Sequence, residues 1–363
     1  MTDLSRKKTL EVKIGSVGVG GDNPVRVQSM TSTDTRDAEA TLGQIRKLAE
    51  AGCEIVRAAV PDDAAADSLA LIVKHSPLPV VADIHFDHRL ALRSMEAGVH
   101  GLRLNPGNIK EKSRVDKVVD AAADLGIPIR IGVNSGSVHK SLLKKYGGPT
   151  PEAMVASALE HVHILEDKNF HLIKLSLKSS SVLDTIAAYR LMAEKRPYPL
   201  HIGITEAGTR FRGAVKSGVG LGVLLYLGIG DTLRVSLTGD PVQEMPAAWE
   251  ILRSLGLRHR GPEIISCPTC GRTEIDLPAM AEAVEDRLKN VSRVFTVAVM
   301  GCVVNGPGEA READIGLAGG RNCGIIFKKG RVVKKVSGHD LLSEFMAELE
   351  DFLSLTWNTG HNK

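Results

Sequence analysis

Three cysteines near the C-terminus have the spacing of ligands for an iron–sulfur cluster or a metal ion. Cys267 and Cys270 form a Cys-x-x-Cys pair, and Cys302 opens the run Cys-Val-Val-Asn-Gly-Pro-Gly-Glu that ends at Glu309. A Cys-x-x-Cys turn presents two thiolates to one centre, and a third, distant cysteine can occupy another corner of a tetrahedron. Structural zinc sites usually add a second Cys-x-x-Cys or a histidine pair, and neither follows here. The spacing therefore favours an iron–sulfur cluster and leaves zinc or a redox dithiol as alternatives.

A second group of reactive side chains is spread along short apolar runs in the first two thirds of the chain. It consists of six cations together with histidine, acidic and neutral polar residues: Arg57, Asp83, His85, Arg103, Asn105, Arg130, Asn134, Lys174, Ser176, Lys178, His201, Glu206, Arg234 and Ser236. Burying unpaired cations is very costly, so these residues must pair with carboxylates or face a wet cavity. Internal salt bridging is the alternative for any single residue. Because cations outnumber carboxylates, the whole set favours an anionic ligand, and arginine suits bidentate binding of a diphosphate.

The runs that carry these side chains alternate with longer helical patterns. We predict strands over Val25–Met30, Glu54–Val60, Val80–Ile84, Gly101–Leu104, Ile129–Val133, Leu172–Leu177, His201–Ile204 and Leu233–Leu237. We predict helices over Ala38–Glu50, Asp63–His75, Arg89–Ala97, Lys112–Leu125, Pro151–Asp167, Val182–Glu194, Gly213–Tyr226 and Val242–Leu255. This alternation predicts a (β/α)8 TIM barrel, whose active site lies at the C-terminal ends of the strands.

A doubly wound open sheet is the alternative architecture. No Gly-x-Gly-x-x-Gly follows the first strand, so a dinucleotide-binding fold has little support. The glycines between Gly218 and Gly222 lie in a helical pattern and predict close helix packing instead. Ahead of the barrel, the alternating run from Thr9 to Gly20 predicts a hairpin.

The composition is that of an ordinary globular protein. The chain has 363 residues, of which 43% are hydrophobic and 25% charged, and its formal net charge is +3. This balance, with only 4% aromatic residues, gives no reason to expect nucleic-acid or membrane binding. The polar start and the absence of a long apolar run predict neither a signal peptide nor a membrane span. We expect a cytoplasmic protein whose thiols serve metals or catalysis rather than disulfides.

Two domains are predicted, a barrel over residues 1–257 and a small α/β iron–sulfur domain over residues 263–363. The second contains a strand running into Cys267, a helix over Pro278–Lys289, a strand over Phe295–Met300, a hairpin over Gly324–Phe327 and Arg331–Val336, and a helix over Asp340–Leu353. Cys53 and Cys323 are expected to be packed thiols, because free cysteine is commonly buried.

The motifs resemble those of the 4-hydroxy-3-methylbut-2-enyl diphosphate synthase family, also called IspG or GcpE. In the C-terminal part the resemblance rests on Cys-Pro-Thr-Cys-Gly-Arg at 267–272 and Gly-Cys-Val-Val-Asn-Gly-Pro-Gly-Glu at 301–309. Barrel segments similar to that family occur in its order at 27–31, 56–57, 83–86, 103–108, 132–137, 205–208 and 230–236. The resemblance therefore extends over nearly the full length.

The resemblance implies an oxidoreductase of the non-mevalonate (MEP) route of isoprene biosynthesis. The reaction is the two-electron reductive ring opening of 2-C-methyl-D-erythritol 2,4-cyclodiphosphate to 4-hydroxy-3-methylbut-2-enyl diphosphate. A 4Fe-4S cluster would be held by Cys267, Cys270, Cys302 and Glu309, and a reduced ferredoxin or flavodoxin would supply electrons. A carboxylate oxygen is a displaceable ligand, so one iron could bind a substrate oxygen.

Our hypothesis also gives roles to the barrel residues. The substrate would be held by the cations and their polar neighbours: Arg57, Arg103, Arg130, Lys174, His201, Arg234 and Ser236. Asn134 and Glu206 would approach its carbon skeleton. Asp83, Glu206 and Asp231 are the candidates for the acid that protonates the substrate, and the sequence does not rank them.

The layout predicts that two chains share each active site. In a (β/α)8 barrel the last helix returns the chain to the face opposite the mouth. A linker of about six residues reaches at most about 20 Å when fully extended, so a chain has little chance of covering its own mouth. We therefore expect a head-to-tail homodimer in which each cysteine domain caps its partner's barrel.

Two other functions are kept as alternatives. One is a barrel transferase or aldolase with a zinc-bound tail, which would work without a reductant. The other is a non-catalytic iron–sulfur sensor, which would bind an anionic metabolite without turnover.

Overall fold

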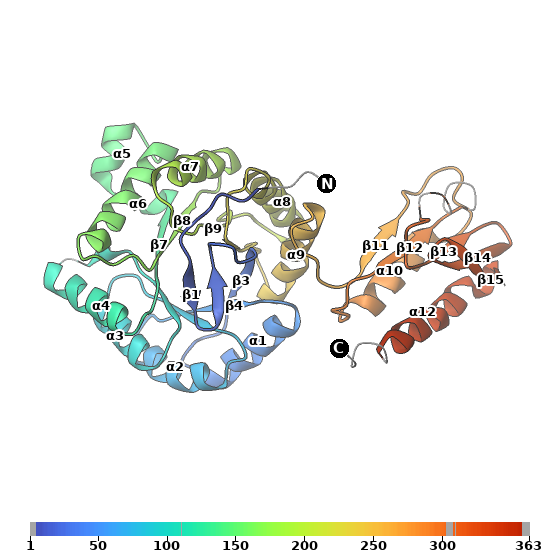
Figure 1. Ribbon diagram of the computed structural model, residues 1–363, viewed down its shortest axis with the longest axis horizontal. Helices are drawn as coiled ribbons and strands as arrows, with labels where there is room; N and C mark the ends of the chain where they lie inside the picture. The colour runs from blue at the N-terminus through green and yellow to red at the C-terminus, as the bar shows by residue number, and fades with distance from the viewer. Residues whose placement is uncertain (1–4, 110, 303–307, 309, 358–363) are drawn as a thin grey trace. The chain divides into compact units, whose positions relative to one another are not determined.

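The chain folds into two compact units, Met1–Arg258 and His259–Lys363 (Figure 1). The computed structural model describes residues 5–109, 111–302, 308 and 310–357. Within these ranges, no helix combines the length and the apolar character that a membrane crossing requires.

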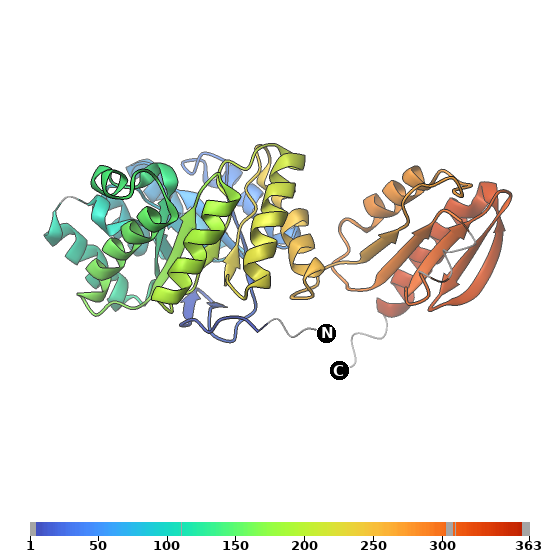
Figure 2. The same cartoon turned by 90° about the horizontal axis from the view of Figure 1, so that it is seen from above.

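Eight parallel strands form the ring of a barrel in the first unit (Figure 1), and helices cover the ring on its outer side (Figure 2). They are β3 (Arg26–Met30), β4 (Ile55–Ala59), β5 (Val80–Asp83), β6 (Gly101–Arg103), β7 (Ile129–Asn134), β8 (Ile173–Lys178), β9 (His201–Ile202) and β10 (Thr232–Leu233). Neighbours follow the order β8-β7-β6-β5-β4-β3-β10-β9. A parallel bridge between Leu175 and Leu200 joins β8 to the start of β9 and brings the two edges together. The predicted (β/α)8 barrel is confirmed.

Helices surround the ring. They are α1 (Ala38–Glu50), α2 (Asp63–His75), α3 (His88–Glu96), α4 (Lys112–Asp124), α5 (Lys140–Tyr146), α6 (Pro151–Glu166), α7 (Val182–Lys195), α8 (Arg210–Tyr226) and α9 (Glu244–Ser254), with 3-10 turns η1 (Pro106–Asn108), η2 (Ser135–Ser137) and η3 (Pro241–Gln243). The side chains of Asp37, Asp62 and Asp87 accept hydrogen bonds from first-turn N–H groups and so fix where α1, α2 and α3 begin. The short helix α5 adds to the predicted order.

The barrel strands direct apolar side chains toward the helices and polar ones toward the interior. In β7, Ile129, Ile131 and Val133 join the core between sheet and helices. Successive side chains of a strand point to opposite faces, so Arg130 points into the barrel. β8 follows the same alternation and places Lys174 on the inner side. The interior is therefore polar, whereas barrel interiors are commonly filled with branched apolar side chains.

A small hairpin covers the N-terminal end of the barrel, as predicted for this segment. β1 (Val12–Ile14) pairs antiparallel with β2 (Val17–Val19). Ile14 packs with Ile55 and Val81, which are inward residues near the starts of β4 and β5. This apolar plug forms the base and leaves the C-terminal ends of the strands as the mouth.

The first unit ends at this base. Arg258 follows α9, and its Nη1 donates to the Val25 carbonyl at 2.7 Å and to Glu54 Oε2 at 2.6 Å. Val25 and Glu54 directly precede β3 and β4, so both mark the N-terminal end of the ring. The Arg258 guanidinium also lies 4.7 Å from the centroid of the Trp249 ring. The chain therefore leaves the barrel opposite the mouth.

The second unit is a five-stranded sheet. Its strands in spatial order are β11 (Glu263–Ser266), β12 (Thr296–Met300), β13 (Ile315–Gly319), β14 (Cys323–Lys328) and β15 (Arg331–Ser337). β11, β12 and β13 are parallel, and the remaining pairs are antiparallel. α10 (Leu277–Leu288) and α12 (Leu341–Trp357), with η4 (Gly338–Asp340) before the latter, complete its described elements. β13 is absent from the predicted elements, because its two glycines weaken the strand signal.

Two cysteines lie outside the predicted cluster site. Cys53 is 4% exposed and its Sγ donates to the Ile55 carbonyl, which confirms a packed thiol. Burial raises the pKa of Cys53 to about 12. Cys323 is exposed, so the prediction of a packed thiol is wrong there. It opens β14, whose buried positions begin only at Gly324.

Candidate functional site

Asp83, at the C-terminal end of β5, is the centre of an ion-pair network inside the mouth. Its carboxylate lies 3.4 Å from Arg57 Nε and 3.3 Å from Arg103 Nη1. Burial opposes its ionisation, but Arg57, Arg103 and Arg130 outweigh burial and lower the pKa of Asp83. Asp83 is therefore held as a carboxylate that positions two arginines.

Two further cations of the mouth are buried with donor atoms that lack a hydrogen-bond acceptor among the described residues. Arg130 of β7 and Lys174 of β8 are neighbours in register, and each is 3% exposed. Among the described residues, nothing accepts a hydrogen bond from Arg130 Nε or Nη2 or from Lys174 Nζ. Burial, reinforced by neighbouring cations, holds the pKa of both groups well below its ordinary value. An uncompensated buried cation is strongly unfavourable, so this arrangement calls for an anion.

Lys178 extends the row of cations along β8 and lies beside His201 of β9. Its Nζ is 3.4 Å from His201 Nε2, while His201 Nδ1 is 2.9 Å from Thr232 Oγ1. Burial, reinforced by Lys178 and Arg130, holds the pKa of His201 well below its ordinary value, so the ring is neutral. Lys178 is not among the predicted substrate-binding residues, although its even spacing from Lys174 places both on the same face of the strand.

Two glycines make room for these cations. A Cβ at Gly132 would come within 3.0 Å of Arg103 Nε, and a Cβ at Gly203 would come within 2.6 Å of Lys178 Nζ. Asn105 fixes the strand at this point. It donates to the Gly132 carbonyl at 2.9 Å and accepts from the Gly132 N–H at 2.8 Å. The strands themselves thus provide space for long cationic side chains.

Arg234 differs from these cations because the protein neutralises its charge. Its Nε and Nη2 donate to the two carboxylate oxygens of Glu244 at 3.1 and 3.0 Å. Glu244 opens α9, is fully buried, and also accepts from Ser29 Oγ at 2.8 Å and from the Leu237 N–H at 3.2 Å. Glu244 is absent from the predicted site residues, because an acidic residue at a helix start is common for reasons of the helix dipole.

Glu206 lies in the loop after β9 and is exposed at the mouth. Its φ of 52° falls in the left-handed region, which is rare for residues other than glycine and costs energy. Asn134 ends β7 and Ser236 follows β10, and both are half-buried at the same end of the barrel. His85 is exposed there too, with Nδ1 3.1 Å from Arg103 Nη1.

Asp231 lies at the opposite end of the barrel, which corrects the expectation that it faces the substrate. It directly precedes β10, and its carboxylate accepts from the Leu200 N–H at 2.8 Å and from Thr9 Oγ1 at 2.9 Å. Burial raises the pKa of Asp231. Its side chain ties the N-terminal segment to the base, so we leave it out of the candidate site.

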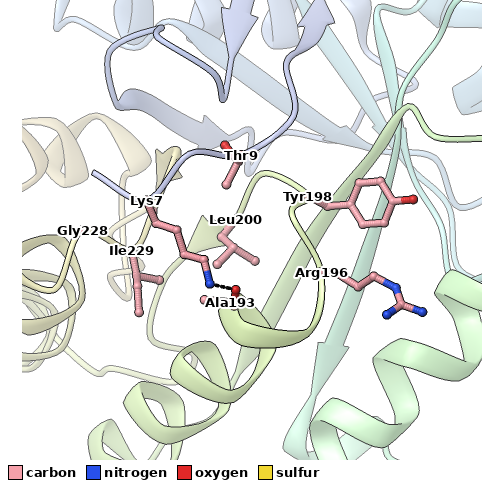
Figure 3. Close-up of a pocket in the computed structure, with 9 residues that line it drawn as sticks. Lys7, Thr9, Ala193, Arg196, Tyr198, Leu200, Gly228 and Ile229 are labelled. Atoms are coloured by element: carbon pink, nitrogen blue, oxygen red, sulfur yellow. Dashed lines mark hydrogen bonds between the residues drawn. The ribbon is translucent and has the colours of Figure 1, made fainter. Parts of the chain in front are cut away.

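A narrow pocket lies beside Asp231 (Figure 3). It is lined in part by Lys7 and Thr9 of the N-terminal segment and by Tyr198. Lys7 Nζ donates to the Ala193 carbonyl across it. Its volume of about 10 Å³ holds no more than a single water molecule. This pocket is too small for a metabolite.

In the second unit, the cysteine loops follow neighbouring parallel strands. Cys267 follows β11, and Cys302 follows β12 after Gly301, so both lie at the same edge of the sheet. The Gly301 N–H donates to Cys267 Sγ at 3.2 Å, and the Glu274 N–H donates to the Gly301 carbonyl at 3.2 Å. A Cβ at Gly301 would come within 2.9 Å of Thr273. The two loops are therefore in close contact through this glycine.

Cys270 is exposed beside the same turn, and its N–H donates to Thr273 Oγ1 at 3.0 Å. Hydrogen bonds from Arg272, the backbone N–H foremost, lower the pKa of the Cys270 thiol. Hydrogen bonds to sulfur and lowered thiol pKa values suit cysteines that bind metal as thiolates. The donor chemistry thus fits the predicted cluster.

The complete ligand set cannot be assembled from the described residues. Within residues 5–109, 111–302, 308 and 310–357, no three His, Cys, Asp or Glu side chains gather closely enough to hold a metal ion. Glu309, the predicted fourth ligand, lies outside the described residues.

Both units match known protein domains. The GcpE TIM-barrel domain matches residues 9–249, and the GcpE protein C-terminal domain matches residues 263–351. The 4-hydroxy-3-methylbut-2-en-1-yl diphosphate synthase (flavodoxin) of Maridesulfovibrio salexigens is 69% identical over 351 residues, which are 96% of this chain and 98% of that protein. The protein of the same name from Nitratidesulfovibrio vulgaris is 64% identical over 352 residues, which are 97% of this chain and 91% of that protein.

Among solved structures, a dihydropteroate synthase of Xanthomonas albilineans matches with a TM-score of 0.49 and 13% identity, over 69% of this chain and 100% of that one. A likeness this distant lends no support to the zinc-tailed transferase. Since both family domains match in order and the relatives cover nearly the whole chain, this chain belongs to the GcpE family.

Proposed function

We propose that this chain catalyses the reductive ring opening of 2-C-methyl-D-erythritol 2,4-cyclodiphosphate to 4-hydroxy-3-methylbut-2-enyl diphosphate. The observation that carries the proposal is the set of buried, uncompensated cations at the mouth, in a chain whose relatives are named for that product. In this reaction a carbon–oxygen bond to the diphosphate breaks and a hydroxyl group leaves as water. Two electrons and two protons enter. The site must therefore hold a diphosphate, donate protons and receive electrons.

Arg103, Arg130 and Lys174 are the residues to which we assign the diphosphate. They lie on three adjacent strands, and two of them carry buried donors that no described residue satisfies. A bound diphosphate would accept those hydrogen bonds and offset the unfavourable burial of the cations. Because these donors are fixed by the strands before the ligand arrives, little reorganisation is needed on binding.

The other polar residues of the mouth support this group. Arg57 is oriented by Asp83, and Lys178 and the neutral His201 extend the polar wall on the other side. Arg234, held by Glu244, contributes a fixed donor surface rather than a free charge. Ser236 lies at the rim near it.

We assign proton donation to Glu206. It is the candidate acid that is exposed at the mouth, where a substrate carbon skeleton can reach it. Asp83 is kept ionised by its arginines and has no proton to give, and Asp231 lies at the base. The left-handed backbone at Glu206 is consistent with this role, because such strain clusters at active sites. Asn134 would contact the carbon skeleton from the end of β7.

Cys267, Cys270, Cys302 and Glu309 would hold a 4Fe-4S cluster. The hydrogen bond from the Gly301 N–H to Cys267 Sγ is of the kind that tunes the potential of such clusters. When bound, the cluster supplies single-electron transfer and a Lewis-acidic iron. We propose reduced flavodoxin, which appears in the names of the relatives, as the electron donor. We also propose that the reaction takes place in the cytoplasm.

Each active site would combine the barrel of one chain with the cysteine loops of a second. Arg258 is anchored at the base, and the Gly261 N–H already donates to the Ser292 carbonyl of the second unit at 3.0 Å. From Arg258 to Cys267 the chain can extend at most about 32 Å. A path outward past the helices, up the barrel and back over the mouth is on the order of 50 Å. We therefore propose a head-to-tail homodimer in which each second unit caps the partner's barrel.

The reaction is tested with protein purified anaerobically and supplied with the cyclodiphosphate and reduced flavodoxin. We expect about four iron and four acid-labile sulfide per chain, with formation of the linear diphosphate. Zinc without sulfide would contradict the cluster. Binding of the cyclodiphosphate without turnover, with intact cluster and reductant, would contradict the reaction and favour a sensor.

The two-chain site is tested with chains that each lack one half. Arg130→Met disables the barrel, and Cys267→Ser disables the cluster. Random pairing of the two coexpressed chains gives mixed dimers with one complete site each, so about a quarter of wild-type activity is expected. A mixture no more active than its parents would contradict the shared site and leave the reaction assignment intact.

A further inference from the structure

Positive charge gathers on the segment between β7 and α6, which contains the short helix α5 (Figure 1). Because β7 ends and α6 begins at the mouth end of the barrel, this segment lies on the rim of the mouth. It covers residues 135–150 and contains no acidic residue. We define the α5 face by its exposed basic residues: His139, Lys140, Lys144 and Lys145.

The other segments that join a barrel strand to the next helix at the mouth differ in charge from this one. Each of them contains an acidic residue or no charge at all: residues 31–37, 60–62, 84–87, 104–111, 179–181, 203–209 and 234–243. The α5 segment is therefore the part of the rim where basic residues occur without acidic ones. A protein or ligand attracted to the rim by its negative charge would be drawn to this part.

The lysines of α5 are not engaged in ion pairs within the described part of the chain. There, no carboxylate pairs with Lys140, Lys144 or Lys145. By contrast, Lys168 after α6 contacts two carboxylates of α4 at 3.1 and 3.0 Å. The helix dipole is a sufficient reason for Lys144 and Lys145, which lie in the last turn of α5, but it disfavours Lys140 in the first turn. The three charges together are therefore not explained by the stability of the helix.

Packing against the barrel holds α5 in place. A helix of seven residues is too short to be stable by itself. Leu142 is 6% exposed and joins the barrel core, and Leu143 packs against that core. Gly147, with a φ of 74°, ends the helix and donates its N–H to the Leu143 carbonyl. Lys140 and Lys144 are four positions apart and so project from the same side of this anchored helix.

The proposed function requires electrons to arrive while the mouth is occupied. The reaction consumes two electrons and the cluster passes them singly, so at least one must arrive after the substrate has bound. In the proposed two-chain site the cysteine loops face the mouth, and a donor protein must then approach at the rim. Lys140 lies six residues beyond Asn134 at the mouth, a span of at most about 22 Å. A protein bound to α5 would therefore lie beside the mouth.

We propose that the α5 face is the docking surface for the acidic electron-donor protein, which is reduced flavodoxin in the proposed function. The inference rests on that function and adds the place where the donor binds. Complexes between redox proteins are weak and have small interfaces, and complementary charges steer their association. Such steering raises association rates by about 10- to 1000-fold. Exposed lysines with no acidic residue among them suit a partner that presents carboxylates.

Charge reversal of the α5 face tests the proposal in the anaerobically purified protein. A triple variant with Lys140→Glu, Lys144→Glu and Lys145→Glu should raise the KM for reduced, acidic flavodoxin at least about 10-fold, because like charges would then meet. With dithionite-reduced methyl viologen in place of flavodoxin, kcat and the KM for the cyclodiphosphate should equal the wild-type values. Added salt should raise the flavodoxin KM of the wild-type chain and lower that of the variant.

The matched control reverses three lysines at the base of the barrel. Lys13, Lys74 and Lys195 are exposed, and within the described residues no carboxylate pairs with them. Changing all three to glutamate alters the net charge as much as the α5 variant does. Because charges far from a contact are screened, the flavodoxin KM of this control should stay within about twofold of the wild-type value. Circular dichroism verifies that both triple variants are folded.

Chemical cross-linking locates the contact without relying on turnover. A carbodiimide joins a lysine amine to a carboxylate as an amide, with loss of water. In the wild-type chain we expect flavodoxin to be linked to Lys140, Lys144 or Lys145, and we expect high salt to suppress the links. Links found only at other lysines would overturn the proposal, and so would a folded α5 variant that keeps the wild-type flavodoxin KM. A rise in the KM for the cyclodiphosphate alone would overturn it too, because the lysines would then steer the substrate.

These measurements separate failure of the docking surface from failure of the proposed function. A wild-type chain that converts no cyclodiphosphate with either reductant rejects the proposed function. In that case cross-links to flavodoxin at α5 still support the docking surface, and their absence rejects it. Normal turnover with methyl viologen, together with an unchanged flavodoxin KM in the α5 variant, rejects the docking surface and leaves the reaction standing.

Discussion

The barrel mouth and the cysteine loops position their reactive groups in opposite ways. In the mouth, cations project from the strands themselves into space left by glycines, and Arg103 and Lys174 are 8% and 3% exposed. At the edge of the second unit, the thiols follow the strands in loops, and Cys270 is exposed. The mouth is thus electrostatically unfavourable on its own, whereas the thiol of Cys270 is accessible to a ligand.

This difference predicts different consequences of substitution. In the mouth, a change alters both ligand binding and the stability of the free protein, because charge is buried there. At the cysteine edge, a change should alter the content of the proposed cluster and have little effect on the barrel, since the two regions belong to separate compact units. Measuring ligand binding, the free energy of unfolding and cluster content in the same variants therefore separates the two kinds of site.

The largest effect is expected at the cysteines. Cys267→Ser should lower iron and sulfide per chain to background and reduce turnover at least about 10³-fold, because a cluster held by three thiolates does not survive the loss of one. Pyrophosphate binding by the barrel should be unchanged. Cys323→Ser is the matched control, since Cys323 is an exposed cysteine of the same unit outside both loops. Equal loss of iron in the two variants would contradict the ligand assignment.

The barrel was predictable because its signals are local. Strands such as β7 alternate apolar residues with others, and a cation between two apolar residues of a strand is conspicuous, as at Arg130. The spacing of the cysteines likewise predicts a metal or cluster site from residues close in sequence. These features depend on residues close in sequence, so no long-range contact had to be known.

The rest of the site depends on contacts between distant segments. Glu244 holds Arg234 across the start of a helix, where an acidic residue has ordinary reasons to occur. Asp231 is predicted from a motif, although the direction of the parallel strands places a residue before β10 at the base. The alternation of the strands identifies inward residues, but it does not say which cations have partners.

Two substitutions in the mouth should change the free energy of unfolding in opposite directions. One removes the counter-charge of a paired cation, and the other removes an unpaired cation. Glu244→Gln leaves the half-buried Arg234 without its counter-charge, so we expect the free energy of unfolding to fall by about 3 kcal/mol. Urea unfolding without ligand measures this change. Glu250→Gln on the same helix is the control, since Glu250 is 61% exposed and should contribute less than about 0.5 kcal/mol. Equal stability of both variants would show that Arg234 does not depend on Glu244.

Arg130→Met is the opposite case. It removes an uncompensated buried cation, so we expect the free protein to become more stable by about 1–2 kcal/mol. It also removes charged donors, so pyrophosphate binding should weaken about 10- to 100-fold by calorimetry. Arg93→Met, at an exposed ion pair with Asp63, serves as the control and should change neither quantity appreciably. Weaker binding together with lower stability would mean that Arg130 has a structural partner after all.

The smallest effect concerns pH and the loop after β6. His161 Nδ1 accepts from the Gly107 N–H at 2.9 Å and so holds this loop at the mouth. Burial, with a smaller contribution from Arg103, lowers the pKa of His161 to about 4. The unfolded chain takes up the same proton near pH 6.5. Between these values the unfolded state binds more protons, so stability rises with pH and is lost as the pH falls from about 6.5 to about 4.

His161→Gln isolates this contribution, because glutamine can still accept from the Gly107 N–H but does not titrate. Between pH 7 and pH 5 the wild-type chain should lose up to about 2 kcal/mol that the variant keeps, measured by urea unfolding at each pH. His75→Gln, at the exposed end of α2, is the control and should retain the wild-type pH dependence. Because the loop carrying Gly107 adjoins Arg103, pyrophosphate affinity should fall with stability in the wild-type chain and less so in His161→Gln. If the free energy of unfolding depended on pH identically in all three chains, His161 would not be the cause of the lost stability, and the mouth would not depend on His161.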